Sequence, residues 1–127
     1  MIDVACGIIE RNGKILAAKR KIELRHGGLW EFPGGKLDPT ETAEAALIRE
    51  IWEELAMEIR ILQRLIDVVH AYPTGVIRLY PFVCQWVAGE PTLTDHEEIG
   101  WYLPEDLPAL DWVAADLPVL DQYLHLK

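Results

Sequence analysis

The chain has 127 residues, half of them apolar and 26% charged, which suits one compact domain spanning residues 1–127. Its formal net charge of −9, from 21 acidic and 12 basic residues, argues against binding to duplex nucleic acid, because clustered Lys and Arg hold the phosphate backbone. The longest apolar stretches, such as Val4–Ile9, fall far short of the ~18 residues that span a membrane. The N-terminus also lacks the basic start and apolar run of a signal peptide.

The two cysteines support an expected cytoplasmic location. Cys6 and Cys84 each lie inside an apolar run, and the Cys-x-x-Cys spacing of metal and redox pairs is absent. We therefore expect both to be buried, reduced thiols in the core.

The N-terminal third has the pattern of strands and loops. Ile2–Glu10 and Ile15–Lys19 are expected to be strands, joined by the Asn12-Gly13 signal of a tight hairpin. The chain should then continue as a polar loop (21–29), a short strand (Trp30–Pro33) and a second loop (Gly34–Glu41).

Thr42–Leu55 is the clearest predicted helix. Thr42 suits the N-cap, and Glu44 lies where the helix dipole favours a carboxylate. The apolar residues that recur at helical spacing, and are expected to face the core, are Leu47, Ile48, Ile51 and Leu55.

The remaining chain is expected to form more strands and a closing helix. The predicted elements are strands at Arg60–Val69, Val76–Val87 and Ile99–Leu103 and a helix at Leu117–Leu126, with a Tyr-Pro-Thr-Gly turn between the first two strands. Mixed strands with helices on both sides predict an α/β/α sandwich.

Three glutamates of the central helix form one acidic face. At ~100° per residue, Glu50, Glu53 and Glu54 fall within an arc of ~100°, away from the apolar face. Like charges this close repel one another, so a cation is expected to compensate them. Carboxylate oxygens are the ligands that Mg²⁺ and Mn²⁺ prefer. A solvated acidic face is the simpler alternative from the helix alone.

Residues 35–57 read GKLDPTETAEAALIREIWEELAM, which resembles the Nudix box G-x5-E-x7-R-E-U-x-E-E-x-G-U, where U is a bulky aliphatic residue. The matching positions are Gly35, Glu41, Arg49, Glu50, Ile51, Glu53, Glu54 and Met57. Ala56 departs from the pattern, since the box has a second Gly there. That Gly would end the helix in a left-handed conformation, so the departure concerns the turn and not the acidic residues.

The resemblance implies the α+β Nudix fold, an α/β/α sandwich with a mixed β-sheet, and a Mg²⁺ site in which Mn²⁺ can substitute. The implied metal ligands are Glu50, Glu53, Glu54 and the backbone carbonyl of Gly34. Glu50 and Glu53 are the implied catalytic residues, Glu50 as a candidate to activate water. Arg49 and Glu41 would brace the loop against the helix, and Gly35 would let the backbone turn beside the metal.

A further carboxylate outside the box often completes the metal shell of this family. Glu98 is our candidate, with Glu97 as the alternative and a solvated loop acid as the simpler explanation of either. Because Mg²⁺ prefers oxygen ligands, we expect His70 and His96 to have structural or surface roles.

Two further segments resemble MutT-type nucleoside triphosphate pyrophosphohydrolases. Residues 29–35 (LWEFPGG) resemble their approach to the box, and residues 115–118 (ADLP) resemble a segment of the bacterial CTP and oxidised-nucleotide members. The resemblance implies that Asp116 contacts the base, Arg20 the substrate and Phe32 the base face. Asp116 could instead cap the last helix, Arg20 could be a surface charge, and Phe32 or Trp30 could be core.

Together these features predict Mg²⁺-dependent hydrolysis of a normal or oxidised (deoxy)nucleoside triphosphate to the monophosphate and pyrophosphate. The alternatives are a pyrophosphatase for ADP-ribose or another nucleoside diphosphate derivative, and a non-catalytic nucleotide-binding module. The expected partner is a small nucleotide, without duplex nucleic acid or membrane, and the expected state is a monomer or weak homodimer.

Overall fold

A computed structural model describes residues 1–93 and 95–127. The strands are β1 (Ile2–Arg11), β2 (Lys14–Arg20), β3 (Trp30–Glu31), β4 (Gly34–Lys36), β5 (Glu58–Arg64), β6 (Val68–Tyr72), β7 (Gly75–Ala88) and β8 (His96–Tyr102). The helices are α1 (Ala43–Leu55) and α2 (Leu117–His125), preceded in the case of α2 by two 3₁₀ turns, η1 (Pro104–Ala109) and η2 (Ala114–Asp116). Within the described residues, neither helix is long and apolar enough to cross a membrane.

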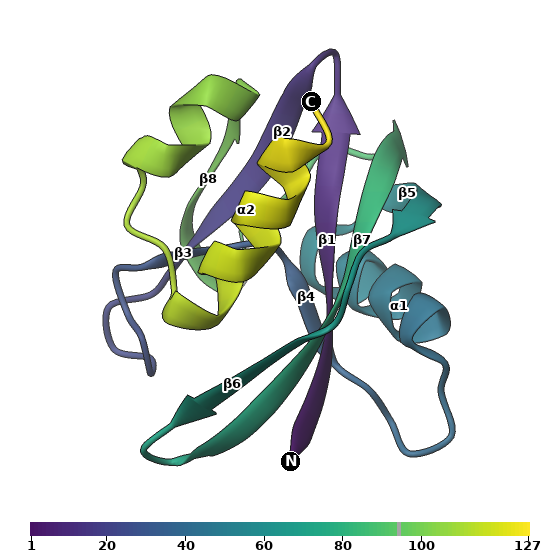
Figure 1. The fold of residues 1–127 in the computed structure, drawn as a ribbon. Helices are drawn as coiled ribbons and strands as arrows, with labels where there is room; N and C mark the ends of the chain where they lie inside the picture. The colour runs from purple at the N-terminus through teal and green to yellow at the C-terminus, as the bar shows by residue number, and fades with distance from the viewer. Residues whose placement is uncertain (94) are drawn as a thin grey trace.

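The strands form one mixed sheet with a helix on each face. Its main path runs β3-β2-β1-β7-β5, with β1 and β7 parallel and the other pairs antiparallel. Strand β4 pairs with β1, β6 with β7, and β8 with β2. Figure 1 shows α2 in front of the sheet and α1 behind it. The predicted α+β fold with a mixed sheet between helices is confirmed.

Alternate residues of β1 supply two separate cores, because successive side chains of a strand point to opposite faces. Cys6 and Ile8 pack in the core on the α2 side, while Ala5 and Ile9 pack in the core beneath α1. Cys6 and Cys84 are both buried and free, as predicted.

The predicted hairpin between the first two strands is confirmed. Asn12 and Gly13 have φ of 52° and 77°, the left-handed conformation that a two-residue hairpin turn of type I′ needs at both positions. Arg11 pairs with Lys14 across the turn.

The prediction of one strand over Arg60–Val69 is wrong. The segment forms two strands, β5 and β6, which pair one after the other with β7. The break lies opposite Pro81 of β7, whose carbonyl accepts from the N–H of Leu65. Since proline has no N–H to donate, the hydrogen-bond ladder is interrupted there.

Three smaller predictions also need correction. The expected loop Gly34–Glu41 begins with strand β4, and the expected strand at Ile99 already begins at His96. Ile48 does not face the core: it is 45% exposed on the outer side of α1, where Trp52, one turn on, is 62% exposed. The buried apolar face is completed instead by Ala43 and Ala46.

Helix α1 begins and ends as its sequence predicts. Thr42 is the N-cap, and its Oγ1 accepts from the N–H of Ala45 at 3.1 Å. Ala56, at the C-terminal end, has φ 55° and ψ 36°, and its N–H donates to the carbonyl of Trp52. A non-glycine residue therefore occupies the left-handed position where the Nudix box has glycine.

Because alanine carries a steric cost at that position, Ala56→Gly should raise the free energy of unfolding by ~1 kcal/mol. Urea denaturation would measure it. The matched control is Ala45→Gly on the exposed side of the same helix, which should lower stability by ~1 kcal/mol. Destabilisation by both substitutions would contradict the proposed cost at Ala56.

Candidate active site

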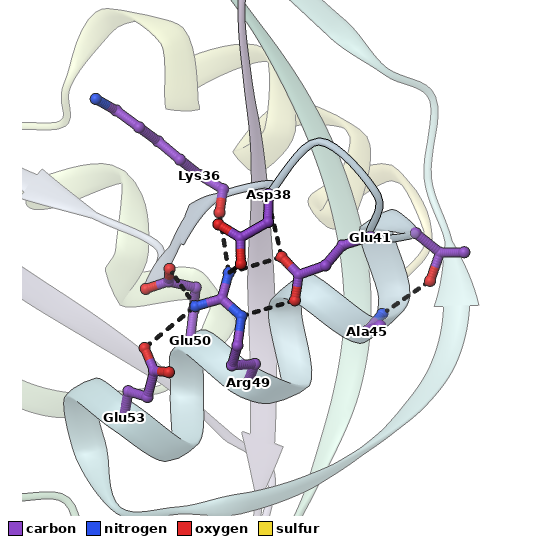
Figure 2. Close-up of polar contacts among 8 residues, drawn as sticks. Lys36, Asp38, Glu41, Ala45, Arg49, Glu50 and Glu53 are labelled. Atoms are coloured by element: carbon purple, nitrogen blue, oxygen red, sulfur yellow. Dashed lines mark hydrogen bonds and ion pairs between the residues drawn. The ribbon is translucent and has the colours of Figure 1, made fainter.

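Arg49 joins the acidic face of α1 to the loop that precedes the helix (Figure 2). Its Nε and Nη2 donate to the two carboxylate oxygens of Glu41 at 2.7 and 2.8 Å. Its Nη1 donates to Glu50 at 2.9 Å and to Glu53 at 3.1 Å, and Nη2 also reaches the carbonyl of Lys36. One guanidinium thus contacts three of the four acidic positions of the Nudix box.

The ion pair between Arg49 and Glu41 shifts the pKa of both groups. The hydrogen bonds from Arg49, followed by one from the N–H of Asp38, lower the pKa of Glu41 to about 2. The same contacts, with Glu41 first and Glu50 second, raise the pKa of Arg49. The pair therefore stays ionised at neutral pH and holds the loop and helix together.

Gly34 and Gly35 bring strand β4 into close contact with its neighbours. A Cβ on Gly34 would collide with the backbone of Ala5 and Cys6 on β1, and one on Gly35 would collide with the carboxyl group of Glu50. Neither residue has positive φ, so their role is close approach in a strand and not the tight turn expected from the sequence.

A cavity of about 590 Å³ lies next to these residues and has two chemically different ends. The first, which we call the acidic end, contains Glu31, Glu50, Glu54 and Asp95 beside the backbone of Gly34. Glu53 does not line the cavity, and its side chain is 56% exposed. Of the three predicted helix ligands, Glu50 and Glu54 therefore line the cavity and Glu53 does not.

Glu54 shows how crowded the acidic end is. Burial, followed by the charges of Glu50, Glu31 and Asp95, raises its pKa to about 8. Such mutual repulsion among carboxylates is what a bound cation relieves. The oxygen-only donor set also fits a hard divalent ion. As arranged here, no group of three acidic, His or Cys side chains in residues 1–93 and 95–127 encloses a metal position. Glu50 and Glu53 each accept a hydrogen bond from Nη1 of Arg49 through one carboxylate oxygen.

Glu98 and Glu97 are not among the residues that line the cavity. Glu97 forms a surface ion pair with Lys19 at 3.4 Å, and Glu98 is exposed opposite Lys19 in the β2–β8 pairing. Asp95, three residues before Glu98, lines the cavity instead. The structure thus does not bring Glu98 to the acidic end, whereas Asp95, which the sequence did not single out, lines the cavity there.

Three residues of the cavity wall are linked by hydrogen bonds, with Glu31 between Arg20 and His96. Arg20 Nη1 contacts both oxygens of Glu31 at 3.2 and 3.3 Å, and its Nε donates to the carbonyl of Arg25. His96, 4% exposed, places Nε2 2.9 Å from Glu31. Arg20 therefore lines the cavity, with much of its guanidinium engaged with protein atoms, and its contact with substrate stays a prediction.

The other end of the cavity, which we call the base chamber, is mostly apolar. Phe32 and Asp116 line it, together with Cys6, Leu79 and Tyr72. Phe32 is 3% exposed and packs on Trp112, with ring centroids 4.6 Å apart. Trp30 is buried but does not line the cavity.

Asp116 is a buried acid at the wall of this chamber. Its Oδ2 accepts from the N–H of Phe32 at 2.8 Å, and burial is the largest reason why its pKa rises to about 8. The side chain makes no capping hydrogen bond to α2, so the helix-cap alternative is wrong. An uncharged carboxylic acid at pH 7 can donate a hydrogen bond from one oxygen while accepting at the other.

Comparison with known proteins agrees with this geometry. The sequence profile of the NUDIX domain matches residues 1–123. The CTP pyrophosphohydrolase of Escherichia coli (strain K12) is 34% identical over 127 residues, covering 100% of this chain and 94% of that protein. The 8-oxo-dGTP diphosphatase of Proteus vulgaris is 38% identical over 87 residues, 67% of this chain and 78% of the relative. The crystal structure of a MutT NUDIX hydrolase from Burkholderia pseudomallei has a TM-score of 0.85 and 32% identity, covering 95% and 96% of the two chains.

Fold, acidic helix and relatives define a hydrolase of the MutT-like type. The chain belongs to the Nudix family, whose members generally require divalent metal ions.

Proposed function

We propose that this chain is a Mg²⁺-dependent pyrophosphohydrolase of (deoxy)nucleoside triphosphates, normal or oxidised, that releases the nucleoside monophosphate and pyrophosphate. The observation that carries the proposal is the single cavity that joins the acidic end to the base chamber. An acidic end alone would suit many phosphate esters. A buried hydrogen-bonding group in an apolar chamber adds a place for a flat heterocycle.

The acidic end supplies the oxygen ligands for Mg²⁺. Glu50, Glu53, Glu54 and the carbonyl of Gly34 are the proposed ligands, and Asp95 is preferred to Glu98 because it lines the cavity. When bound, the ion offsets negative charge on the phosphates and makes the attacking water more acidic. Mg²⁺ commonly leaves part of its coordination shell to substrate phosphates, which suits an open set of ligands.

Protein groups then orient the reactants. Arg49 fixes the Glu50 carboxylate, which we assign as the acceptor of the water proton. The water oxygen attacks the β-phosphorus, and the bond from that phosphorus to the α,β-bridging oxygen breaks. The bridging oxygen leaves with the nucleoside monophosphate, and the water oxygen ends in pyrophosphate. Phe32 offers a face for the base, and Asp116 a hydrogen bond to its edge.

A product-resolved assay tests this function. Normal and oxidised nucleoside triphosphates, ADP-ribose, nucleotide sugars and dinucleotides would be incubated with Mg²⁺, and nucleotide and pyrophosphate would be quantified separately. We expect triphosphates to give monophosphate and pyrophosphate, with activity lost in excess EDTA. Faster hydrolysis of ADP-ribose or dinucleotides would favour the diphosphate-derivative alternative. Binding without turnover of any compound would favour a non-catalytic module.

A further inference from the structure

Tyr72 connects two parts of the base chamber that are distant in the sequence. It is the last residue of β6, and its hydroxyl accepts a hydrogen bond from the N–H of Ala115 at 2.9 Å. Ala115 belongs to η2 and immediately precedes Asp116. In Figure 1, β6 lies in the hairpin at the lower end of the sheet, whereas the chain before α2 descends from the upper left.

The bond satisfies a group that the local sequence leaves without a partner. The first N–H groups of a helical turn have no acceptor within the turn and need one from elsewhere. Val113, the residue in the N-cap position of η2, has no side chain that could accept. The Tyr72 hydroxyl takes this role from another strand, so it fixes the start of η2 against β6.

Asp116 lies next to this anchor and takes part in further hydrogen bonds. Its carboxyl is held by the N–H of Phe32, and its own N–H donates to the carbonyl of Val113. The residues that lead into η2 are bonded to β3, where the N–H of Val113 donates to the carbonyl of Trp30. The bond to the Tyr72 hydroxyl adds a link from η2 to β6. A hydrogen bond to a base edge weakens steeply when donor and acceptor are displaced or tilted.

The ring of Tyr72 is itself held in place. It packs between His26, with ring centroids 4.6 Å apart, and His70, at 4.4 Å. These contacts involve the ring and not the hydroxyl. Removing the oxygen alone would therefore leave the ring packing intact and release only η2.

We propose that Tyr72 is a positioning residue for base selection, whose hydroxyl acts through the η2 backbone to place the Asp116 carboxyl against the base. This inference rests on the proposed function, because it assumes that Asp116 reads the base. It adds a residue outside the Nudix box, at the end of β6 beside η2, to the determinants of specificity.

The test is a double-mutant cycle in which the measured quantity is the ratio of kcat/KM for CTP to kcat/KM for UTP. Wild type, Tyr72→Phe, Asp116→Asn and the double variant would be compared by kcat/KM for CTP and UTP at one alkaline pH. We expect Tyr72→Phe to move the CTP/UTP ratio about three- to tenfold toward that of Asp116→Asn, mainly through KM. The double variant should have the same ratio as Asp116→Asn alone.

The matched control is Tyr80→Phe. Its hydroxyl also takes part in hydrogen bonding, including a bond to Asp3 at 3.2 Å, but Tyr80 does not line the cavity, so its loss should leave the ratio unchanged. A wild-type ratio in Tyr72→Phe, or independent effects that multiply in the double variant, would overturn the inference. So would a wild-type enzyme that hydrolyses both nucleotides without discrimination. A wild type that hydrolyses no triphosphate instead refutes the proposed function itself.

Discussion

Glu53→Gln is expected to lower turnover of nucleoside triphosphates by about 10²-fold or more while the fold stays intact. The substitution keeps the size of the side chain and removes one negative charge from the proposed metal ligands. Glu53 is 56% exposed and outside both cores, so its neutralisation should cost little stability. Steady-state kinetics over a range of Mg²⁺ concentrations would measure the loss, and thermal unfolding would establish that the variant is folded.

Glu44→Gln is the matched control, because Glu44 lies in the first turn of the same helix and is exposed. It should retain near-wild-type turnover, with at most a few tenths of a kcal/mol lost from the helix dipole interaction. Near-wild-type activity of Glu53→Gln at modest Mg²⁺ would contradict the assignment of Glu53 as a metal ligand.

The second large effect concerns the pH dependence of base preference. The pKa of Asp116 is raised to about 8 by burial. Below that pH the acid is protonated and its hydroxyl donates, which suits the carbonyl oxygen of uracil or of guanine-type bases. Above it the carboxylate only accepts, which suits the amino group of cytosine or adenine. The kcat/KM ratio of CTP to UTP should therefore rise about tenfold or more between pH 6.5 and pH 9, since an unpaired buried acceptor costs about 1–3 kcal/mol.

An ordinary ionised aspartate, which is all that the sequence reveals at position 116, would favour amino-bearing bases, because a carboxylate only accepts hydrogen bonds. The CTP/UTP ratio of kcat/KM isolates Asp116, because titration of the acidic end changes the kcat/KM of both nucleotides by the same factor. That factor cancels in the ratio. In Asp116→Asn the ratio should be nearly independent of pH, since an amide both donates and accepts throughout. A pH-independent ratio in the wild type, or a persistent pH dependence in Asp116→Asn, would contradict contact between Asp116 and the base.

Local signals in the sequence predict much of this fold. The Asn12-Gly13 turn and the Thr42 cap depend on residues next to each other, and both occur as expected. The break between β5 and β6 depends on Pro81, in a different strand, and so could not be located from residues 65–67 themselves. Strand β4 was missed because its glycines resemble a loop, and only the neighbouring backbone explains them.

The residues of the site were likewise predictable where a local motif marks them and not where they depend on distant strands. The Nudix box identifies the helix glutamates, but which carboxylate near the start of β8 lines the cavity beside them depends on strand register. The β2–β8 pairing shifts between Lys19 and Arg20, so Lys19 lies opposite Glu98 and Arg20 opposite His96. A shift of this kind changes which side chains face the cavity, and no pattern within Asp95–Glu98 reveals it. The burial that alters the chemistry of Asp116 is equally invisible, because Phe32 approaches from 84 residues away.

The pairing of β4 with β1 has a further consequence. Cys6 in the base chamber pairs with Gly34 at the acidic end, so main-chain hydrogen bonding between strands sets the spacing of the two ends. Under the proposed function, the sheet therefore fixes the distance between the bound heterocycle and the reacting phosphorus. Remodelling the chamber should change which nucleoside is accepted without changing which anhydride bond is cut.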